Sequence, residues 1–168
     1  MIDSTTPLPS QFDPHHYRRV LGYYATGVSV LTAQGPEGPV GMACNSLTSV
    51  SLDPPLIAVC PAKTSETWPA IRDTGRFVAN VMAADDVARV LAFAKKGRDR
   101  FAEVAWHPRD CGPALDDALA WIECVVVDEH DAGDHTIAVA QVVALDAPRD
   151  ADPLVFFRSR YGTFAESL

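Results

Sequence analysis

Two long apolar runs separated by a short polar break constrain the fold more than any other feature of this sequence. The first run covers residues 121–129 and the second covers residues 135–145, and Asp131-Ala132-Gly133-Asp134 stands between them. Both runs are rich in valine, which favours extended strands, and glycine next to aspartate is typical of a turn. The pattern predicts a long antiparallel hairpin in which residues 121–127 pair with residues 137–143.

Shorter strands and three helices are expected in the rest of the chain. Asp13-Pro14, an N-cap followed by a first-turn proline, precedes apolar residues at helical spacing and predicts a helix over residues 14–25. Further helices are predicted over residues 65–73, with Gly75 as the stop, and from Asp85 to Gly97. Strands are predicted over residues 28–33, 40–44, 47–51, 56–60, 76–82 and 154–158.

The order of these elements favours a mainly β fold. Six or more strands with three helices that do not alternate regularly with them indicate a closed or partly closed antiparallel barrel rather than a doubly wound α/β sheet. A length of 168 residues is that of one domain. Residues 1–11 show no periodicity and are interpreted as a flexible arm, so the domain is expected over residues 12–168.

Charge and composition argue against several kinds of partner. The net charge of −8 repels a polyphosphate backbone, so nucleic acid is not expected. Neither a membrane-spanning run nor a signal segment is evident, and we expect a cytoplasmic location with no membrane association. Four cysteines without close pairing indicate neither a zinc site nor a disulfide scaffold, and Cys60 and Cys124 are expected to be buried thiols.

The segment of residues 41–51 has the most unusual composition. Hydroxyl and amide side chains crowd between apolar strands there, while the common phosphate-loop, dinucleotide and metalloprotease motifs are missing from the chain. A flat heteroaromatic ligand edged with carbonyl and ring-nitrogen atoms would give such side chains partners. A polar loop that satisfies itself through local turns is the alternative. Gly35, Gly38 and Gly41 are interpreted as residues of a hairpin turn.

Two basic segments are candidates for an anion site. Lys63-Thr64-Ser65-Glu66-Thr67-Trp68 follows a strand and opens a predicted helix, where hydroxyls and free backbone N–H groups suit a phosphate. Lys95-Lys96-Gly97-Arg98-Asp99-Arg100-Phe101 is the densest basic cluster of the chain and is expected to add to the same site. An ordinary helix cap and a solvated helix end are the respective alternatives.

Two further candidates lie near strand ends. The turn Gly133-Asp134-His135 places an imidazole at the mouth of the predicted barrel, although a simple Asp134 turn with an exposed His135 is equally consistent with the pattern. Arg160-Tyr161-Gly162 follows the last apolar run, where an arginine can meet a phosphate and a tyrosine can stack on a ring.

The order of these segments resembles the flavin reductase family, the FMN-binding split barrels that act as reductase components of two-component flavin monooxygenases. The resemblance extends from about Phe12 to Gly162. It is carried by Ala25-Thr26-Gly27-Val28, residues 41–56, Ser65-Glu66-Thr67-Trp68, Lys96-Gly97-Arg98-Asp99-Arg100-Phe101, Gly133-Asp134-His135 and Arg158-Ser159-Arg160-Tyr161-Gly162. It implies a Greek-key split β-barrel with a few peripheral helices.

The resemblance also implies roles for individual residues. The cofactor-binding set that it implies is Thr26, Gly27, Ala43, Cys44, Asn45, Ser46, Thr48, Ser49, Ser51, Lys63, Ser65, Thr67, Trp68, Arg100, Phe101, Gly133, Asp134, His135, Arg160 and Tyr161. In this set Ala43, Asn45 and Ser46 edge the flavin ring, and Thr48, Ser49 and Ser51 extend toward the ribityl chain. Lys63, Ser65, Thr67 and Arg100 surround the phosphate. His135 lies near the site of hydride transfer and is the catalytic candidate, while Arg160 and Tyr161 contact the dinucleotide.

The implied activity is reduction of FMN, or FAD, by NADH or NADPH, with the reduced flavin passed to a partner oxygenase. The resemblance also implies a homodimer. Hydride transfer between two cofactors needs orientation rather than a protein acid or base, which is consistent with a sequence lacking an evident catalytic dyad. Three alternatives stay open at this point: a flavin or haem carrier, a flavin-dependent oxygenase or oxidase, and an interaction module without a cofactor.

Overall fold

A computed structural model describes residues 12–95 and 100–164 of the chain. Its main element is a seven-stranded sheet in which all neighbouring strands are antiparallel. In spatial order the strands are β3 (Gly38–Cys44), β2 (Ser29–Gly35), β6 (Arg76–Val81), β9 (Ala120–Ala132), β10 (His135–Asp146), β5 (Pro55–Val59) and β4 (Thr48–Leu52). The predicted mainly β class is confirmed, and the seven strands expected before residue 154 are all present in this sheet.

The long hairpin is formed by β9 and β10, as the sequence predicts. Val125 pairs with Gln141 and Cys124 with Val142, and the ladder continues to the turn, where Ala132 pairs with His135. The register shifts between Val139 and Ala140 and again before Ala144, which marks two irregularities of the bulge kind. Such irregularities bend and twist the strands, which suits a sheet that curls.

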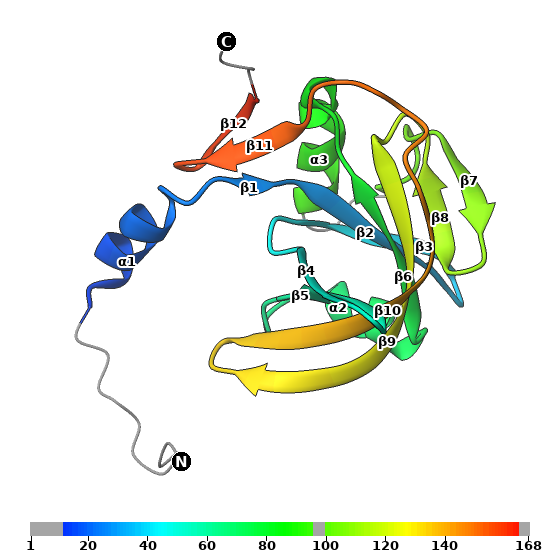
Figure 1. Ribbon diagram of the computed structural model, residues 1–168, viewed down its shortest axis with the longest axis horizontal. Helices are drawn as coiled ribbons and strands as arrows, with labels where there is room; N and C mark the ends of the chain where they lie inside the picture. The colour runs from blue at the N-terminus through cyan, green and yellow to red at the C-terminus, as the bar shows by residue number, and fades with distance from the viewer. Residues whose placement is uncertain (1–11, 96–99, 165–168) are drawn as a thin grey trace.

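The sheet curls on itself (Figure 1), and an apolar core packs against its inner face. Leu31 on β2 and Phe77 on β6 share this core with Ile57 on β5, the strand next to the edge strand β4. The short helix α2 (Trp68–Asp73) adds Trp68 and Ile71 to it. Cys124 is also buried there, as expected, whereas Cys60 is only partly buried at the end of β5.

A hairpin that the sequence interpretation missed covers part of the outer face of the sheet. It comprises β7 (Trp106–Arg109) and β8 (Gly112–Leu115). The buried Asn80 ties it to the sheet by accepting a hydrogen bond from the Leu115 amide at 2.8 Å. Gly112 has a φ of 144°, and a Cβ atom there would lie 2.9 Å from the Thr32 carbonyl oxygen. The hairpin can approach β2 this closely only with glycine at that position.

A second small sheet contains β1 (Thr26–Gly27), β11 (Leu154–Phe157) and β12 (Arg160–Thr163). The predicted last strand is therefore present but ends one residue early, and β1 and β12 were not predicted. Arg158 and Ser159 form the turn between β11 and β12 with φ angles of 51° and 62°. This turn was not predicted, because left-handed turn positions usually hold glycine or asparagine and here hold arginine and serine.

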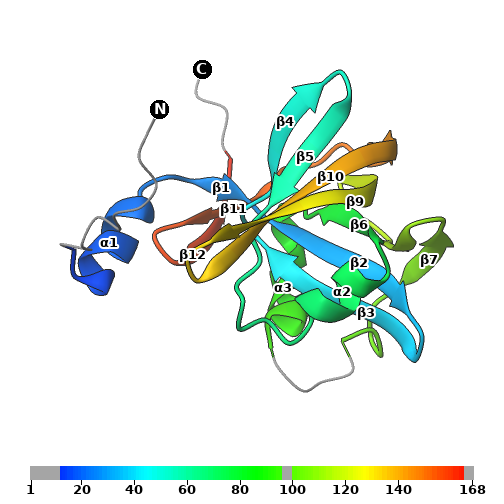
Figure 2. The ribbon, with the colours of Figure 1, turned by 90° about the horizontal axis from the view of Figure 1, so that it is seen from below.

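The N-terminal helix is shorter than predicted and lies apart from the sheet. The helix α1 (Pro14–Leu21) begins where expected, because the Asp13 carboxylate accepts hydrogen bonds from the amides of His15 and His16 at 3.3 and 3.2 Å. It ends at Leu21 rather than at residue 25, and its apolar side chains are exposed in the chain by itself. Figures 1 and 2 both show α1 outside the body of the barrel.

The two other helical predictions need correction at their boundaries. The helix predicted from Ser65 starts three residues later, because the Ser65 hydroxyl accepts from the Trp68 amide at 3.0 Å within a non-helical bend. The next prediction divides into a 3-10 turn, η1 (Ala84–Asp86), and α3 (Val87–Ala94). Gly97, its predicted end, lies outside the described residues.

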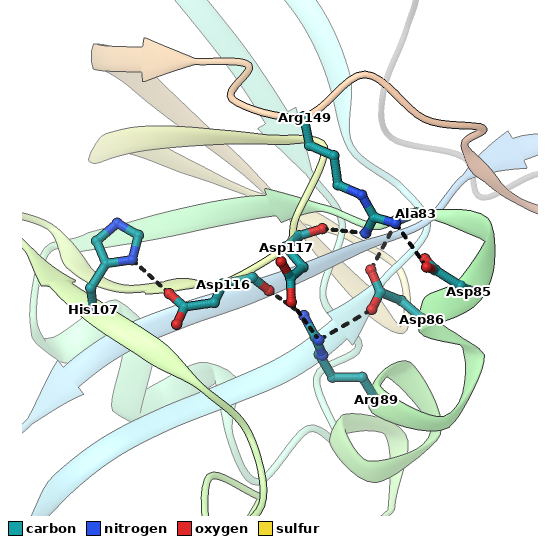
Figure 3. Close-up of polar contacts among 8 residues, drawn as sticks. All are labelled: Ala83, Asp85, Asp86, Arg89, His107, Asp116, Asp117 and Arg149. Carbon is teal, nitrogen blue, oxygen red and sulfur yellow. Dashed lines mark hydrogen bonds and ion pairs between the residues drawn. The ribbon is translucent and has the colours of Figure 1, made fainter.

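A cluster of charged residues fixes α3 to the barrel (Figure 3). The buried Asp86 accepts from the Ala83 amide at 3.1 Å and pairs with Arg89 at 3.5 Å. Arg149, on the segment that leads to β11, pairs with Asp85 at 2.7 Å and donates to the Asp117 carbonyl oxygen at 2.7 Å. These contacts hold three separate segments together beside α3.

Candidate functional site

A cavity of about 200 Å³ lies where the end of β3 meets α3 and the small sheet. Its lining comprises Val28, Ala43, Cys44, Asn45, Val90, Phe156 and Tyr161. Three predicted site residues from the unusual segment are thus brought together with Tyr161. Val90 and Phe156 were not predicted, because an apolar helix face and an apolar strand read as core in a sequence.

A second cavity, of about 240 Å³, is lined by Gly41, Thr67, Arg100 and Phe101 together with Pro39, Val40, Glu66 and Ala70. Gly41 and Ala43 are two residues apart on β3, and residues at this spacing point to the same face of a strand. The two cavities therefore lie along one face of β3. The sequence interpretation placed the ring of a ligand at the first and its phosphate at the second.

Arg100 is a cation in the lining of the second cavity, which also contains the carboxylate of Glu66. Its Nη1 atom donates to the Thr67 hydroxyl at 2.8 Å and to the carbonyl oxygen of Gly41, and its Nε atom donates to the Lys95 carbonyl oxygen at 3.1 Å. These acceptors are neutral, so the contacts orient the guanidinium without cancelling its charge. A guanidinium beside a hydroxyl is a suitable receptor for a phosphate group.

Gly41 sets the distance between β3 and α3. A Cβ atom at this position would lie 2.8 Å from Cε1 of Phe93, which is buried on α3. The Phe93 ring in turn packs edge-on against Phe101, with ring centroids 5.1 Å apart. Gly35 and Gly38 do flank the β2–β3 turn, but Gly41 lies inside β3, so its interpretation as a turn residue was wrong.

Three predicted ligand contacts have internal partners. The Ser46 hydroxyl accepts from the Cys60 amide at 2.8 Å and lies 3.3 Å from the Cys44 sulfur. Ser65 is held by the Trp68 amide, and the buried Trp68 ring donates through Nε1 to Glu129 at 2.9 Å. In this arrangement Ser46, Ser65 and Trp68 shape the bend around the cavities.

Lys63 has different interaction partners from Arg100 and Thr67. Its ammonium group pairs with Asp131 near the end of β9, and its amide donates to the Asp134 carbonyl oxygen at 2.9 Å. Ala62 forms an isolated bridge with His135. The segment after β5 therefore contacts the predicted nicotinamide turn through Ala62 and Lys63. The same segment continues to Thr67, one of the predicted phosphate residues.

The turn between β9 and β10 holds His135 through Asp134. Nδ1 of His135 lies 2.7 Å from an Asp134 carboxylate oxygen. The hydrogen bond with His135 is the main reason that the pKa of Asp134 is lowered. A groove of about 650 Å³ separates this turn from α1. Gly133, with a φ of 67°, provides the left-handed residue that the turn requires.

The remaining predicted residues are not in the lining of either cavity. Thr48 and Ser49 are exposed and Ser51 half-buried on β4, the edge strand of the sheet. Gly27 is exposed on β1, and Arg160 lines a separate groove beside the β11–β12 turn. The Thr26 hydroxyl oxygen is buried, and the described part of the chain offers it no hydrogen-bond partner.

These features fit a flat ring with an anionic tail. The small side chain of Ala43 leaves room in the first cavity, Tyr161 contributes an aromatic ring to it, and Arg100 contributes a cation to the second cavity. The orphaned hydroxyl of Thr26 is consistent with a polar ligand in this region. Burial raises the pKa of Cys60 and raises the pKa of Cys124 to about 12, so neither of these two thiols is activated as a nucleophile.

Residues 12–95 and 100–164 contain neither a candidate metal centre nor a helix suited to a membrane. No cluster of three or more metal-ligating side chains occurs among them. None of the helices in this part of the chain has the length and apolar character needed to span a bilayer.

Comparison with known proteins agrees with the geometry. The family model described as Flavin reductase like domain matches residues 21–165. The chain is 40% identical over 150 residues to the flavin-dependent monooxygenase reductase subunit HsaB of Rhodococcus jostii, covering 89% of this chain and 77% of the relative. It is 42% identical over 159 residues to the FMN reductase (NADH) SmoA of Agrobacterium fabrum, covering 94% and 90%. The solved structure of the NADH:FAD oxidoreductase SgcE6 of Streptomyces globisporus superposes with a TM-score of 0.87 at 32% identity, covering 96% and 99%.

Proposed function

The chain belongs to the flavin reductase-like domain family, and from this premise we propose that it oxidises NADH or NADPH and reduces FMN or FAD. The family resemblance, the split-barrel fold and the enzyme class expected from the sequence are thereby confirmed. The reduced flavin then passes to a partner oxygenase, as the names of HsaB and similar reductase components indicate for those proteins. When bound, the flavin supplies the hydride-accepting chemistry, and the protein supplies orientation.

The arrangement of the two cavities along β3 is the single observation that supports this proposal most strongly. Ala43, Asn45 and Tyr161 surround a space at one end, where they would hold the isoalloxazine ring. Thr67 and Arg100 would hold the phosphate at the other end. The bond between Arg100 and the carbonyl oxygen of Gly41 ties the phosphate residues to the strand that carries the ring residues.

His135 has a positioning role in the same proposal. Its contact with Asp134 fixes the imidazole orientation at the tip of the β9–β10 hairpin, where it would contact the nicotinamide. The bridge between Ala62 and His135 ties this tip to the segment that ends at Thr67. The backbone thus links His135, which would contact the nicotinamide, to Thr67, which would contact the flavin phosphate. Such a link favours a fixed distance between the two cofactors.

Exposed apolar side chains support a homodimer as the working assembly. Leu52 on β4 and Leu145 on β10 are 92% and 67% exposed, and Val143 is 55% exposed. Apolar residues this exposed at the edge of a sheet are typical of a covered surface. The cytoplasm is the proposed location, and the free cysteines among the described residues are consistent with a reducing compartment.

Steady-state oxidation of NADH and NADPH with FMN, FAD and riboflavin tests the activity directly. We expect a flavin-dependent rate that needs no organic substrate and no second protein. Cytochrome c reduction, or coupling to an added oxygenase, then shows that reduced flavin leaves the site. An NAD(P)H oxidation rate that does not increase with added flavin would contradict the proposal and favour a flavin carrier.

A further inference from the structure

A third cavity, of about 590 Å³, lies at the C-terminal end of α2 and is not used by the flavin site described above. This volume lies within the usual range of small-molecule sites, roughly 300–1,000 Å³. The β2–β3 hairpin, α2 with its C-cap, and the start of β6 contribute to its lining, which includes Gln34, Pro36, Ala70, Asp73, Thr74 and Arg76.

The third cavity adjoins the second cavity, which Arg100 lines. Ala70 lines both of them. Gln34 of the third cavity pairs with Pro39 of the second, and paired residues of antiparallel strands point to the same face with Cβ atoms roughly 4.5–5.5 Å apart. The helix α2 lies beside β2 and β3, which carry these two residues (Figure 2). The two cavities are therefore neighbouring parts of one surface along α2.

The length of α2 suits the second half of a flavin dinucleotide. Thr67, in the second cavity, and Thr74, in the third, cap the two ends of the helix. At a rise of about 1.5 Å per residue these ends are about 10 Å apart. A second phosphate, a ribose and a base joined in series have a comparable length. A dinucleotide whose first phosphate binds at Arg100 therefore has room for its adenylate beside α2.

Arg76 provides a planar cation in the third cavity. Its Nη1 atom donates to the carbonyl oxygen of Asp110 at 3.4 Å, and no carboxylate in the described part of the chain pairs with it. A guanidinium that is exposed and free of a carboxylate can stack on a flat ring. Asp73 also lines the cavity, but its carboxylate pairs with Arg72 at 2.9 Å.

Gln34 provides the polar edge that an adenine requires. Its amide nitrogen donates to the carbonyl oxygen of Gly35 at 3.3 Å, which leaves its second N–H and its oxygen for a ligand. A donor and an acceptor on one side-chain amide match the N6 and N7 atoms of adenine. Pro36 and Ala70 add apolar surface beside it.

We propose that the third cavity binds the adenylate half of FAD, with Arg76 stacking on the adenine and Gln34 bonding to its edge. The proposal rests on the proposed reductase function, and it assigns FAD as the flavin that the chain binds more tightly. The first phosphate binds at Thr67 and Arg100 in both flavins, so FMN occupies the same site without the adenylate. Arg76 and Gln34 thus select between the two flavins and do not hold the flavin ring.

Isothermal titration calorimetry without NADH tests the proposal by measuring the Kd of FAD and of FMN. The wild type is expected to bind FAD about tenfold more tightly than FMN. Arg76→Ala is expected to raise the Kd of FAD about tenfold and to leave the Kd of FMN unchanged, which also shows that the variant is folded. Gln34→Ala is expected to weaken FAD in the same selective way. Arg19→Ala is the matched control, because Arg19 on α1 contacts His16 at 3.0 Å and lies outside this lining.

The outcomes separate this proposal from the reductase function itself. Equal losses of FAD and FMN affinity in Arg76→Ala would assign Arg76 to the stability of the fold and contradict the proposal. Equal affinities of the wild type for FAD and FMN, or unchanged FAD affinity in both Arg76→Ala and Gln34→Ala, would contradict it as well. The reductase function is rejected by a different result, the failure of the wild type to oxidise NADH or NADPH with any flavin.

Discussion

Arg100 donates a hydrogen bond to the Thr67 hydroxyl at 2.8 Å and another to the carbonyl oxygen of Gly41. This pair of contacts joins the segment after α3, the bend before α2 and the strand β3 at one point. Because Gly41 and Ala43 face the same way on β3, the point lies directly along the strand from the cavity at Ala43. A cation fixed at this position by neutral partners is the best placed of the predicted residues to bind a phosphate.

Arg100→Ala is predicted to weaken FMN binding selectively. Loss of a charge-assisted contact of about 1.5–3 kcal/mol corresponds to a roughly tenfold to hundredfold rise in Kd. Riboflavin, which lacks the phosphate, should lose little affinity. Quenching of flavin fluorescence measures both constants, and Arg100→Lys should recover part of the FMN affinity.

Lys63→Ala is the informative control for that experiment. Lys63 was also predicted as a phosphate contact, but its ammonium group pairs with Asp131 on the β9–β10 hairpin. Its removal should therefore weaken FMN binding less than removal of Arg100. A larger selective loss of FMN affinity in Lys63→Ala than in Arg100→Ala would place the phosphate near the hairpin instead.

His135→Ala is predicted to slow flavin reduction while leaving the Kd for FMN within about twofold of the wild-type value. The imidazole lies on the hairpin turn, whereas the contacts of Arg100 and Thr67 do not involve that turn. Stopped-flow measurement of flavin reduction by NADH gives the rate, and fluorescence titration gives the affinity. An unchanged reduction rate would remove His135 from the nicotinamide site.

The parts of the fold that follow from local pattern could be predicted from the sequence. The β9–β10 hairpin could be predicted because valine-rich runs flank a turn that contains Gly133. β7 and β8 were missed because Pro108 and Pro113 argue against strands, and their position depends on the buried Asn80, which is distant in sequence. Tertiary hydrogen bonds of this kind leave no local signal.

The sequence named several of the residues that line the two cavities. Ala43, Asn45, Thr67, Arg100 and Tyr161 were all named from the sequence, and the structure gathers them around two cavities on one strand. The sequence could not separate Lys63 from this group, because distance along the chain does not reveal the Asp131 partner. Val90 was not predicted as a lining residue, because its place in the apolar pattern of the helix is that of a core residue.

Gly41→Ala is predicted to destabilise the protein by about 1–3 kcal/mol, the usual effect of overpacking. The new methyl group would lie 2.8 Å from Cε1 of the buried Phe93, so β3 and α3 would have to separate. Urea unfolding measures the change. Gly27→Ala is the control, because a Cβ atom at Gly27 meets nothing within 4 Å. Phe93→Leu in the Gly41→Ala background should recover part of the loss, and the absence of any recovery would contradict the assigned clash.

Asp86 and Asp85 are predicted to change the pH dependence of stability in opposite directions. Burial raises the pKa of Asp86 above 3.8, whereas its neighbour Asp85 has a pKa lowered mainly by the hydrogen bond from Arg149. As the pH rises from 3.8 through the raised pKa, the unfolded state releases the Asp86 proton first, so Asp86 makes the folded state less stable over that interval. Asp85 instead adds stability above pH 3.8, and this contribution is lost as the pH falls through its lowered folded-state pKa.

Urea unfolding of the wild type, Asp86→Asn and Asp85→Asn from pH 3 to pH 7 measures both effects. With rising pH the wild type should lose stability relative to Asp86→Asn and gain stability relative to Asp85→Asn. A change of the same sign relative to both variants would show that burial does not control the pKa of Asp86.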